Sequence, residues 1–359
     1  MDPLTHAISG AALARAFPKQ PLPHSQFILL ALLSMAPDAD ILLRFFSDTV
    51  YLQHHRGLTH SLLMLPLWAW LVFSLGSRRI KQHPGMPWLI GLALLLHICL
   101  DLITTFGTMI LAPFSDWRAS LDLLFIIDPF LTACLLLPLL PGLIWKQHVR
   151  KLGVLSLLLM FSYLGLTFSN QQQAINLAKK THPNAIAVNA LPLAFSPWHW
   201  QMIVTYPNHY VRAEVNLKPG FPGTSMLFDE SFVTGLLSSK ITGPDNILWQ
   251  ELPAMHTVKQ AQGLPGTAFY AWFARYPVLL KQHADYIEFG DLAFGGGAPG
   301  VRPAFQLHID LKDGASESNS ALSAHASGIT HPRAWLIWRD NRKSELTLIS
   351  APFKWLQSE

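Results

Sequence analysis

The chain has 359 residues, of which 50% are hydrophobic and only 13% are charged, and its formal net charge is +4. Soluble domains carry about 25% charged residues, so the composition excludes a protein that is soluble over its whole length. The basic residues gather in short loops beside apolar segments, in residues 77–86 and 146–151. Charge placed there is typical of membrane topology signals, and it argues against a nucleic-acid partner.

Apolar stretches dominate the first 169 residues. A short helix is predicted over residues 4–17, because Pro18 would end it. Longer stretches follow, most of them about long enough to span a hydrocarbon core of roughly 30 Å. We therefore expect residues 1–169 to form an α-helical polytopic membrane domain with about four or five spans. The apolar stretches are residues 26–46, 61–76, 87–111, 124–145 and 152–168.

The two basic loops also predict an orientation, because loops rich in Lys and Arg stay in the cytoplasm. Counting spans outward from them puts residues 47–60 and 112–123 on the opposite face, together with everything after residue 168. In a Gram-negative bacterium this is a multi-pass inner-membrane protein with a periplasmic C-terminal domain.

The composition changes near residue 170. A helix at 170–181 is expected to continue the last span, and residues 313–332 are small and polar and predict a loop. Alternating or aromatic-rich segments separated by Pro and Gly clusters predict strands. We expect residues 170–359 to form a soluble α+β domain, mostly antiparallel β. The predicted strands are 203–216, 267–276, 285–294, 303–311 and 334–350.

Histidines and aspartates occur in four short motifs within the apolar half. Ionisable side chains at membrane depth are costly and are therefore functional candidates, and imidazoles with carboxylates suit zinc and similar divalent ions. His97 and Asp101 are spaced i, i+4 and share one face of a predicted helix. The predicted topology brings all four motifs to the same outer depth. The predicted metal ligands are His6, Asp38, His55, His60, His97 and Asp101.

Three further residues have predicted catalytic roles. Asp40 is a further ligand or a general base, and Arg56 holds an anionic group of the substrate. Asp122 belongs to the site or forms a salt bridge with Arg118. Structural alternatives stay open: a buried hydrogen-bonded pair in place of the i, i+4 ligands, a surface turn in place of the two-histidine motif, or a helix cap at one of the paired aspartates.

Five motifs in the same half resemble a known family. They are MDPLTH at 1–6, APDAD at 36–40, HHRGLTHS at 54–61, HICLD at 97–101 and RASLDLLFIIDP at 118–129. Together they resemble the YdjM-like family of bacterial inner-membrane proteins, over roughly residues 1–170. The resemblance implies a LexA-regulated, membrane-bound metal-dependent hydrolase and names no substrate. The C-terminal part looks like the extension of longer members, although Ala293 in FGDLAF stands where an arginine is expected.

The order His, Asp, His and then His-x-x-x-Asp is also similar to that of zinc-dependent phospholipase C and P1-type nucleases, which implies a phosphoester substrate. The resulting hypothesis is a membrane-bound hydrolase that cleaves a phosphoester or other ester of a lipid-like, membrane-associated substrate. One or two divalent ions, zinc or else manganese, would activate water, and membrane lipids are the expected partners.

Two rival hypotheses come from other classes. The first is a transporter or proton relay that uses intramembrane His and Asp. The second is a non-catalytic envelope-stress protein whose metal is structural.

Overall fold

The computed structural model describes residues 1–19, 21–81, 83–218, 242–295, 303–311, 333–338 and 342–346. The loop predicted at 313–332 lies outside these residues, as do residues 339–341 and 347–350 of the strand predicted at 334–350.

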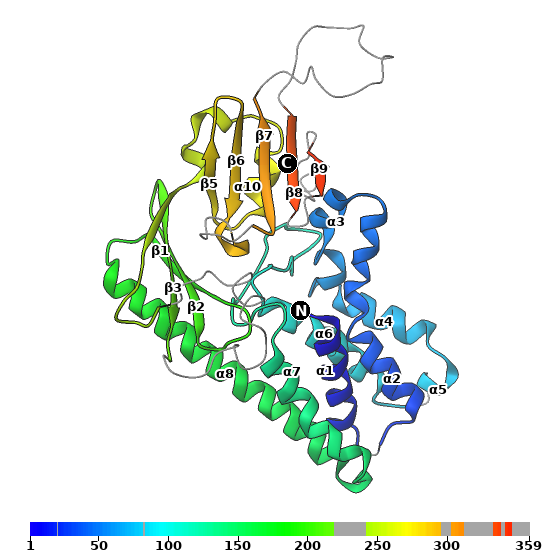
Figure 1. The fold of residues 1–359 in the computed structure, drawn as a ribbon. Helices are drawn as coiled ribbons and strands as arrows, with labels where there is room; N and C mark the ends of the chain where they lie inside the picture. The colour runs from blue at the N-terminus through cyan, green and yellow to red at the C-terminus, as the bar shows by residue number, and fades with distance from the viewer. Residues whose placement is uncertain are drawn as a thin grey trace, which may run out of the picture.

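The N-terminal half is helical, and its helices pack around a central one (Figure 1). This central helix, α1, contacts α2, α6, α7 and α8. It begins at Asp2, whose carboxylate accepts a hydrogen bond from the Thr5 N–H at 2.9 Å. Gly10 lets α1 approach α2, because a Cβ atom there would lie 2.6 Å from the Leu30 carbonyl oxygen. The helices are α1 (Pro3–Ala16), α2 (His24–Leu33), η1 (Ala36–Phe45), α3 (Asp48–His54), η2 (Leu58–His60), α4 (Leu65–Leu75), α5 (Arg78–Lys81), α6 (Met86–Leu102), α7 (Pro129–Leu136), η3 (Leu137–Leu143), η4 (Lys146–His148) and α8 (Val149–Thr181).

Fewer spans are found than the four or five that we expected. Among the described residues, one helix, Lys146–Thr181, is long and apolar enough to cross a membrane. The number rises to three if each of two bent helix pairs counts as one span, while Met86–Leu102 and Pro129–Leu143 are shorter apolar helices. Proline is the physical reason for the first bend, because Pro37 interrupts the predicted 26–46 span and α2 and η1 meet at 54°.

The C-terminal half contains two antiparallel sheets, as predicted for an α+β domain. The first has the order β1-β2-β3-β4 and the second β5-β6-β7-β8-β9, with every neighbouring pair antiparallel. Figure 1 shows the second sheet above the helical half and the first beside the end of α8. The strands are β1 (Ala187–Pro192), β2 (His199–Thr205), β3 (His209–Asn216), β4 (Gln250–Pro253), β5 (Pro277–Gln282), β6 (Tyr286–Asp291), β7 (Phe305–Asp310), β8 (Arg333–Trp338) and β9 (Lys343–Glu345).

Two predicted strands differ from the structure. The segment 203–216 holds the end of β2 and all of β3, which pair as antiparallel neighbours. Residues 267–276 form the helix α10 (Thr267–Phe273) and the turn that follows it. Phe269 and Phe273 are both buried, which is the i, i+4 spacing of a helix face. Gly266 precedes the helix with φ 74°, a left-handed conformation that glycine adopts without strain. The described residues of this half also form three short 3-10 helices: η6 (Met255–Thr257), η7 (Lys259–Ala261) and η8 (Leu292–Phe294).

The two halves are joined by a continuous helix and by side-chain contacts. The helix expected at 170–181 is the last part of α8, whose Ala174 and Ala178 pack against Trp200 of the first sheet. Leu52 and Phe106 of the helical half belong to the buried core of the second sheet and α10. The second sheet therefore covers the end of the helical half that carries the 54–61 motif.

Candidate metal centre

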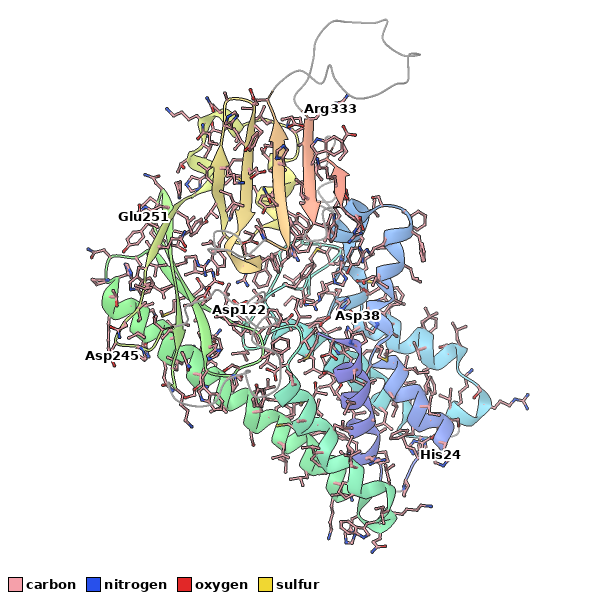
Figure 2. The ribbon with its side chains drawn as sticks, viewed as in Figure 1. His24, Asp38, Asp122, Asp245, Glu251 and Arg333 are labelled. Carbon is pink, nitrogen blue, oxygen red and sulfur yellow. The ribbon has the colours of Figure 1, made fainter. Side chains whose placement is uncertain are left out.

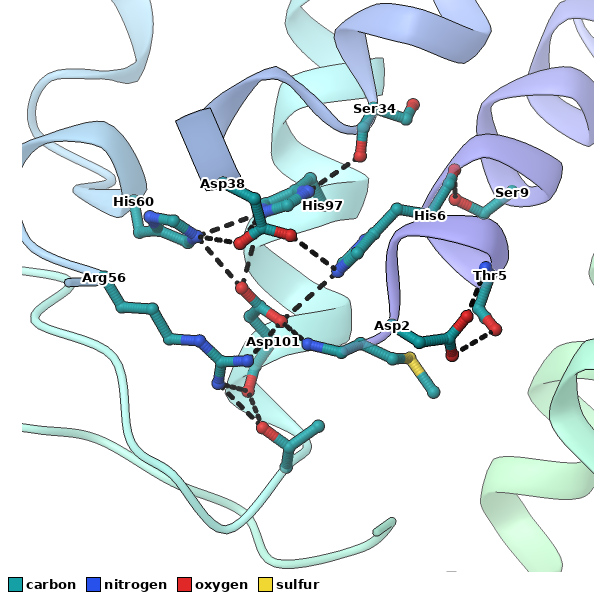
Figure 3. Close-up of polar contacts among 12 residues, drawn as sticks. Asp2, Thr5, His6, Ser9, Ser34, Asp38, Arg56, His60, His97 and Asp101 are labelled. Carbon is teal, nitrogen blue, oxygen red and sulfur yellow. Dashed lines mark hydrogen bonds and ion pairs between the residues drawn. The ribbon is translucent and has the colours of Figure 1, made fainter. Parts of the chain in front are cut away.

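Side chains from three separate segments meet in the interior of the helical half. The donor atoms of His6 on α1, Asp38 on η1, and His97 and Asp101 on α6 all lie within 4.8 Å of one another (Figure 3). The side chains of the two histidines and Asp101 are fully buried, whereas that of Asp38 is 21% exposed. The i, i+4 spacing on α6 places its two residues side by side, as predicted.

His60 lies beside this four-residue group and faces three of its members. Its Nε2 lies 3.0 Å from Asp101 Oδ2 and 3.5 Å from Asp38 Oδ1. It also lies 3.0 Å from His97 Nε2. Three imidazoles and two carboxylates thus converge, and Figure 3 shows them pointing toward one another.

The spacing of these atoms fits a metal ion. Four ligand atoms held about 2.0–2.2 Å from a tetrahedral zinc lie roughly 3.3–3.6 Å from one another. His97 Nε2 is 3.3 Å from Asp101 Oδ2 and 3.7 Å from Asp38 Oδ1. His6 Nε2 is 3.3 Å from Asp101 Oδ1. Imidazole nitrogens and carboxylate oxygens are also ligands that suit zinc or manganese.

A hydrogen bond outside the cluster determines which nitrogen of His97 carries its proton. His97 Nδ1 lies 2.7 Å from the Ser34 carbonyl oxygen, which only accepts, so the proton is on Nδ1 and the Nε2 lone pair faces the cluster. Asp101 Oδ2 lies 3.3 Å from this Nε2 and 3.0 Å from the Nε2 of His60. A lone pair of His97 therefore faces carboxylate oxygens, an arrangement that a divalent cation stabilises.

Two positive groups lie against Asp101. The guanidinium of Arg56 donates to Asp101 Oδ1 at 2.8 Å and to Thr104 Oγ1 at 2.8 Å. The amino group of Met1 also contacts Asp101. Arg56 is buried, and its Nε has no hydrogen-bond partner among the described residues. The arginine predicted to hold an anion is thus inside the site.

Asp40 and His55 lie beside the cluster and face each other. Asp40 Oδ1 is 2.9 Å from His55 Nδ1, and Oδ2 accepts the backbone N–H of Arg56 at 2.9 Å. The His55 ring stacks on Tyr51, with centroids 4.6 Å apart. Both oxygens of Asp40 are therefore used to hold the 54–61 segment, and His55 is not part of the four-residue group that meets at one point.

Asp122 also lies outside that group, and its partner is in the C-terminal half. Arg275 NH2 donates to Asp122 Oδ2 at 2.9 Å. Burial lowers the pKa of the Arg275 guanidinium, but the hydrogen bond and charge of Asp122 outweigh it and hold that pKa above its usual value. The salt bridge with Arg118 that we considered for Asp122 is not formed: Arg118 donates to the Phe106 carbonyl oxygen at 2.6 Å, and burial lowers its pKa to about 9.

Arg275 is a residue that the sequence analysis missed. It follows α10, and Asp291 at the end of β6 holds its backbone, accepting the N–H of Arg275 at 2.8 Å and that of Tyr276 at 2.9 Å. Asp291 also accepts the Ala293 N–H at 3.0 Å, so the segment FGDLAF supplies this support. Asp122 and Arg275 are 153 residues apart, so no local pattern in the sequence links them. The segment FGDLAF was the one sequence feature that pointed to this part of the C-terminal half.

An apolar pocket of about 170 Å³ adjoins the cluster. Three of its lining residues are chain neighbours of donors: Pro37 precedes Asp38, Thr59 precedes His60, and Ile98 follows His97. Other walls come from α2, α4 and α6, including Leu33, Trp68 and Leu94. None of the donors lines this space itself, so the apolar space approaches the cluster through these chain neighbours.

The N-terminal half is thus a set of apolar helices with a candidate His/Asp site, and comparison with known proteins assigns this half to a family of inner-membrane proteins. The family model described as YdjM inner membrane protein matches residues 1–174, so this part of the chain belongs to that family. The resemblance seen in the five motifs is thereby confirmed. The same part contains all five donors.

Among curated proteins, the chain is 31% identical over 140 residues to the protein named "Uncharacterized protein YfhP" from Bacillus subtilis (strain 168). The match covers 36% of this chain and 43% of that relative, so this chain spans less than half of the relative's length. No solved structure matches the chain.

Proposed function

We propose that the protein is a membrane-bound, metal-dependent hydrolase that cleaves a phosphoester or other ester of a lipid-like substrate. The observation that carries the proposal is the convergence of three imidazoles and two carboxylates on one buried point. The family match supports the membrane setting of this site. The substrate class is supported by the apolar pocket beside the donors.

In this proposal one or two divalent ions, zinc or manganese, are held by the five donors: His6, Asp38, His60, His97 and Asp101. Such an ion supplies Lewis-acid chemistry, since it polarises an ester oxygen and acidifies water. Asp38 is the most exposed donor, so substrate enters on its side.

The residues around the donors have separate tasks. Arg56 offsets the charge of Asp101 and offers its unpartnered Nε to an anionic group of the substrate. Asp40 acts as a positioning residue, because both its oxygens hold the 54–61 segment. Asp122 is likewise a positioning residue, which ties the 103–128 segment to the C-terminal half through Arg275.

The direct test is metal content by elemental analysis of the full-length protein purified without chelator. We expect one or two equivalents of zinc or manganese, lost in His97→Ala and retained in His148→Ala, an exposed histidine of η4. Metal-free wild-type protein would overturn the proposal. Phosphodiester hydrolysis, measured with a chromogenic diester and with phospholipid vesicles, should fall at least about 100-fold in His97→Ala.

The rival hypotheses predict different outcomes with the same protein. A transporter or proton relay gives charge or metal flux in liposomes without turnover of a diester. A structural metal gives turnover-free protein that unfolds when the metal is removed. Either result would replace the hydrolase proposal.

We also propose a multi-pass topology with the C-terminal half outside the cytoplasm. The basic segments α5 and η4 lie at the end of the helical half that is remote from the second sheet (Figure 1). In a background without Cys99 and Cys134, an impermeant maleimide applied to spheroplasts should label Gln282→Cys and leave Lys81→Cys unlabelled. The reverse pattern would contradict this orientation.

A further inference from the structure

A second pocket lies at the end of the helical half that is remote from the metal centre. It has a volume of about 420 Å³ and is formed where α1 ends, α2 begins and η3 leads into α8. His24, one of its lining residues, is labelled at that end in Figure 2, whereas Asp38 of the metal centre lies in the middle of the molecule. No donor of the metal centre lines it, so it is a separate site.

The pocket is strongly basic. Arg15, Lys19, Lys146 and Arg150 line it, and no Asp or Glu is found among its lining residues in the described part of the chain. These cations come from two segments more than 120 residues apart in the sequence. A cavity lined by charges of one sign concentrates ligands of the opposite sign, so the expected ligand carries a negative group.

The rest of the wall is apolar, and two of the cations are held in place. Arg150 Nε donates to the Ala16 carbonyl oxygen at 3.4 Å. Phe27, Leu143 and Val149 line the pocket. The guanidinium of Arg15 lies 5.6 Å from the centroid of the Phe27 ring, and its NH1 donates to the Leu139 carbonyl oxygen at 2.7 Å. An apolar wall beside fixed positive charge fits an anion attached to a hydrocarbon body better than a free inorganic anion.

The surface outside the pocket has the pattern of a membrane boundary. Leu143, Ile144 and Trp145 are 66%, 79% and 56% exposed. Lys146 follows them directly. Exposed apolar side chains followed by Trp and then Lys mark the level at which hydrocarbon meets headgroups. The pocket therefore lies at the depth where a phosphate headgroup is found.

We propose that this pocket binds the phosphate of an anionic phospholipid, with part of an acyl chain against the Phe27 and Leu143 wall. Basic pockets between membrane helices recognise anionic headgroups through the same combination of charge and apolar contact. The bound lipid bridges α1 and α8, the central helix and the longest one. This site is independent of the metal centre and of the chemistry proposed there.

The test is native mass spectrometry of the delipidated full-length protein, titrated with phosphatidylglycerol and, separately, with phosphatidylcholine. We expect phosphatidylglycerol to bind at least about 10-fold more tightly. Lys146→Gln/Arg150→Gln should weaken its binding about 30-fold, the equivalent of about 2 kcal/mol for two charges. Arg15 is left unchanged because it also packs against Phe27.

The matched control is Arg78→Gln/Lys81→Gln, which removes the same charge from α5 at the same end of the molecule. We expect its affinity for phosphatidylglycerol to stay within about 2-fold of wild type. Equal weakening in both double variants would overturn the proposal, because it would mean general attraction to basic protein. Equal binding of both lipids would also overturn it, as would displacement of the lipid by millimolar inorganic phosphate. The charge-preserving variant Lys146→Arg/Arg150→Lys should bind as wild type, and its failure to do so would count against the site.

Discussion

The pairing of Arg275 with Asp122 predicts a large loss of stability when only one partner is removed. The side chains of Asp122 and Arg275 are 6% and 23% exposed, so Arg275→Ala leaves a buried carboxylate without its partner. Breaking a fully buried pair costs about 3–5 kcal/mol. Because Arg275 is partly solvated, we expect about 3 kcal/mol.

The assay is thermal unfolding of the full-length protein in detergent. At about 2 °C per kcal/mol for a chain of this size, Arg275→Ala should lower the Tm by about 6 °C. Asp122→Asn/Arg275→Ala should regain part of that loss, since no buried charge remains unpaired. Lys281→Gln removes an exposed ion pair with Glu288 and serves as the control, with a change below about 1 kcal/mol. If Arg275→Ala behaved like this control, or if the double variant were no more stable than Arg275→Ala, the interdomain role of the pair would be refuted.

His55 and His60, two of the three histidines in the 54–61 segment, should behave differently. His60→Gln should abolish metal binding in elemental analysis, while His55→Gln, which removes a ring that faces Asp40, should retain most of it. Equal loss in both variants would mean that His55 is a ligand. Asp291 predicts a pH dependence, because burial raises the pKa of its carboxyl group above the usual value of about 3.8 despite three backbone hydrogen bonds. Between the pKa of Asp291 in the unfolded chain and its higher pKa in the folded protein, the folded protein binds more protons. The contribution of Asp291 to the free energy of unfolding therefore rises as the pH falls through the folded pKa, and it is complete below about 3.8. Tm values measured from pH 7 to pH 4 should rise less, or fall more, in Asp291→Asn than in wild type, and parallel curves would contradict the raised pKa.

The sequence predicted which side chains lie together in the helical half better than it predicted the membrane spans. Spacing alone placed His97 and Asp101 on one helix face, and short motifs identified the other donors. Hydropathy, however, cannot tell a straight span from an apolar segment that bends at Pro37 or leaves the helix after Leu102. That is why the expected number of spans exceeded what the helix lengths support.

Long-range contacts account for most of what could not be predicted. Nothing local to Asp122 indicates a partner 153 residues away, and Arg118, four residues before it, was the natural but wrong choice for a salt bridge. The aromatic segment 267–276 likewise resembled a strand, although the buried face formed by Phe269 and Phe273 belongs to a helix. Side-chain partners of this kind depend on the folded chain rather than on spacing.

The position of the donors along the chain has a consequence for biosynthesis. All five donors lie between His6 and Asp101, whereas Arg275, which ties down Asp122, is synthesised much later. During vectorial synthesis the centre is complete in sequence before either sheet has emerged. The proposed centre therefore has all of its candidate ligands before Arg275 has been synthesised, and its assembly does not depend on the pairing of Arg275 with Asp122.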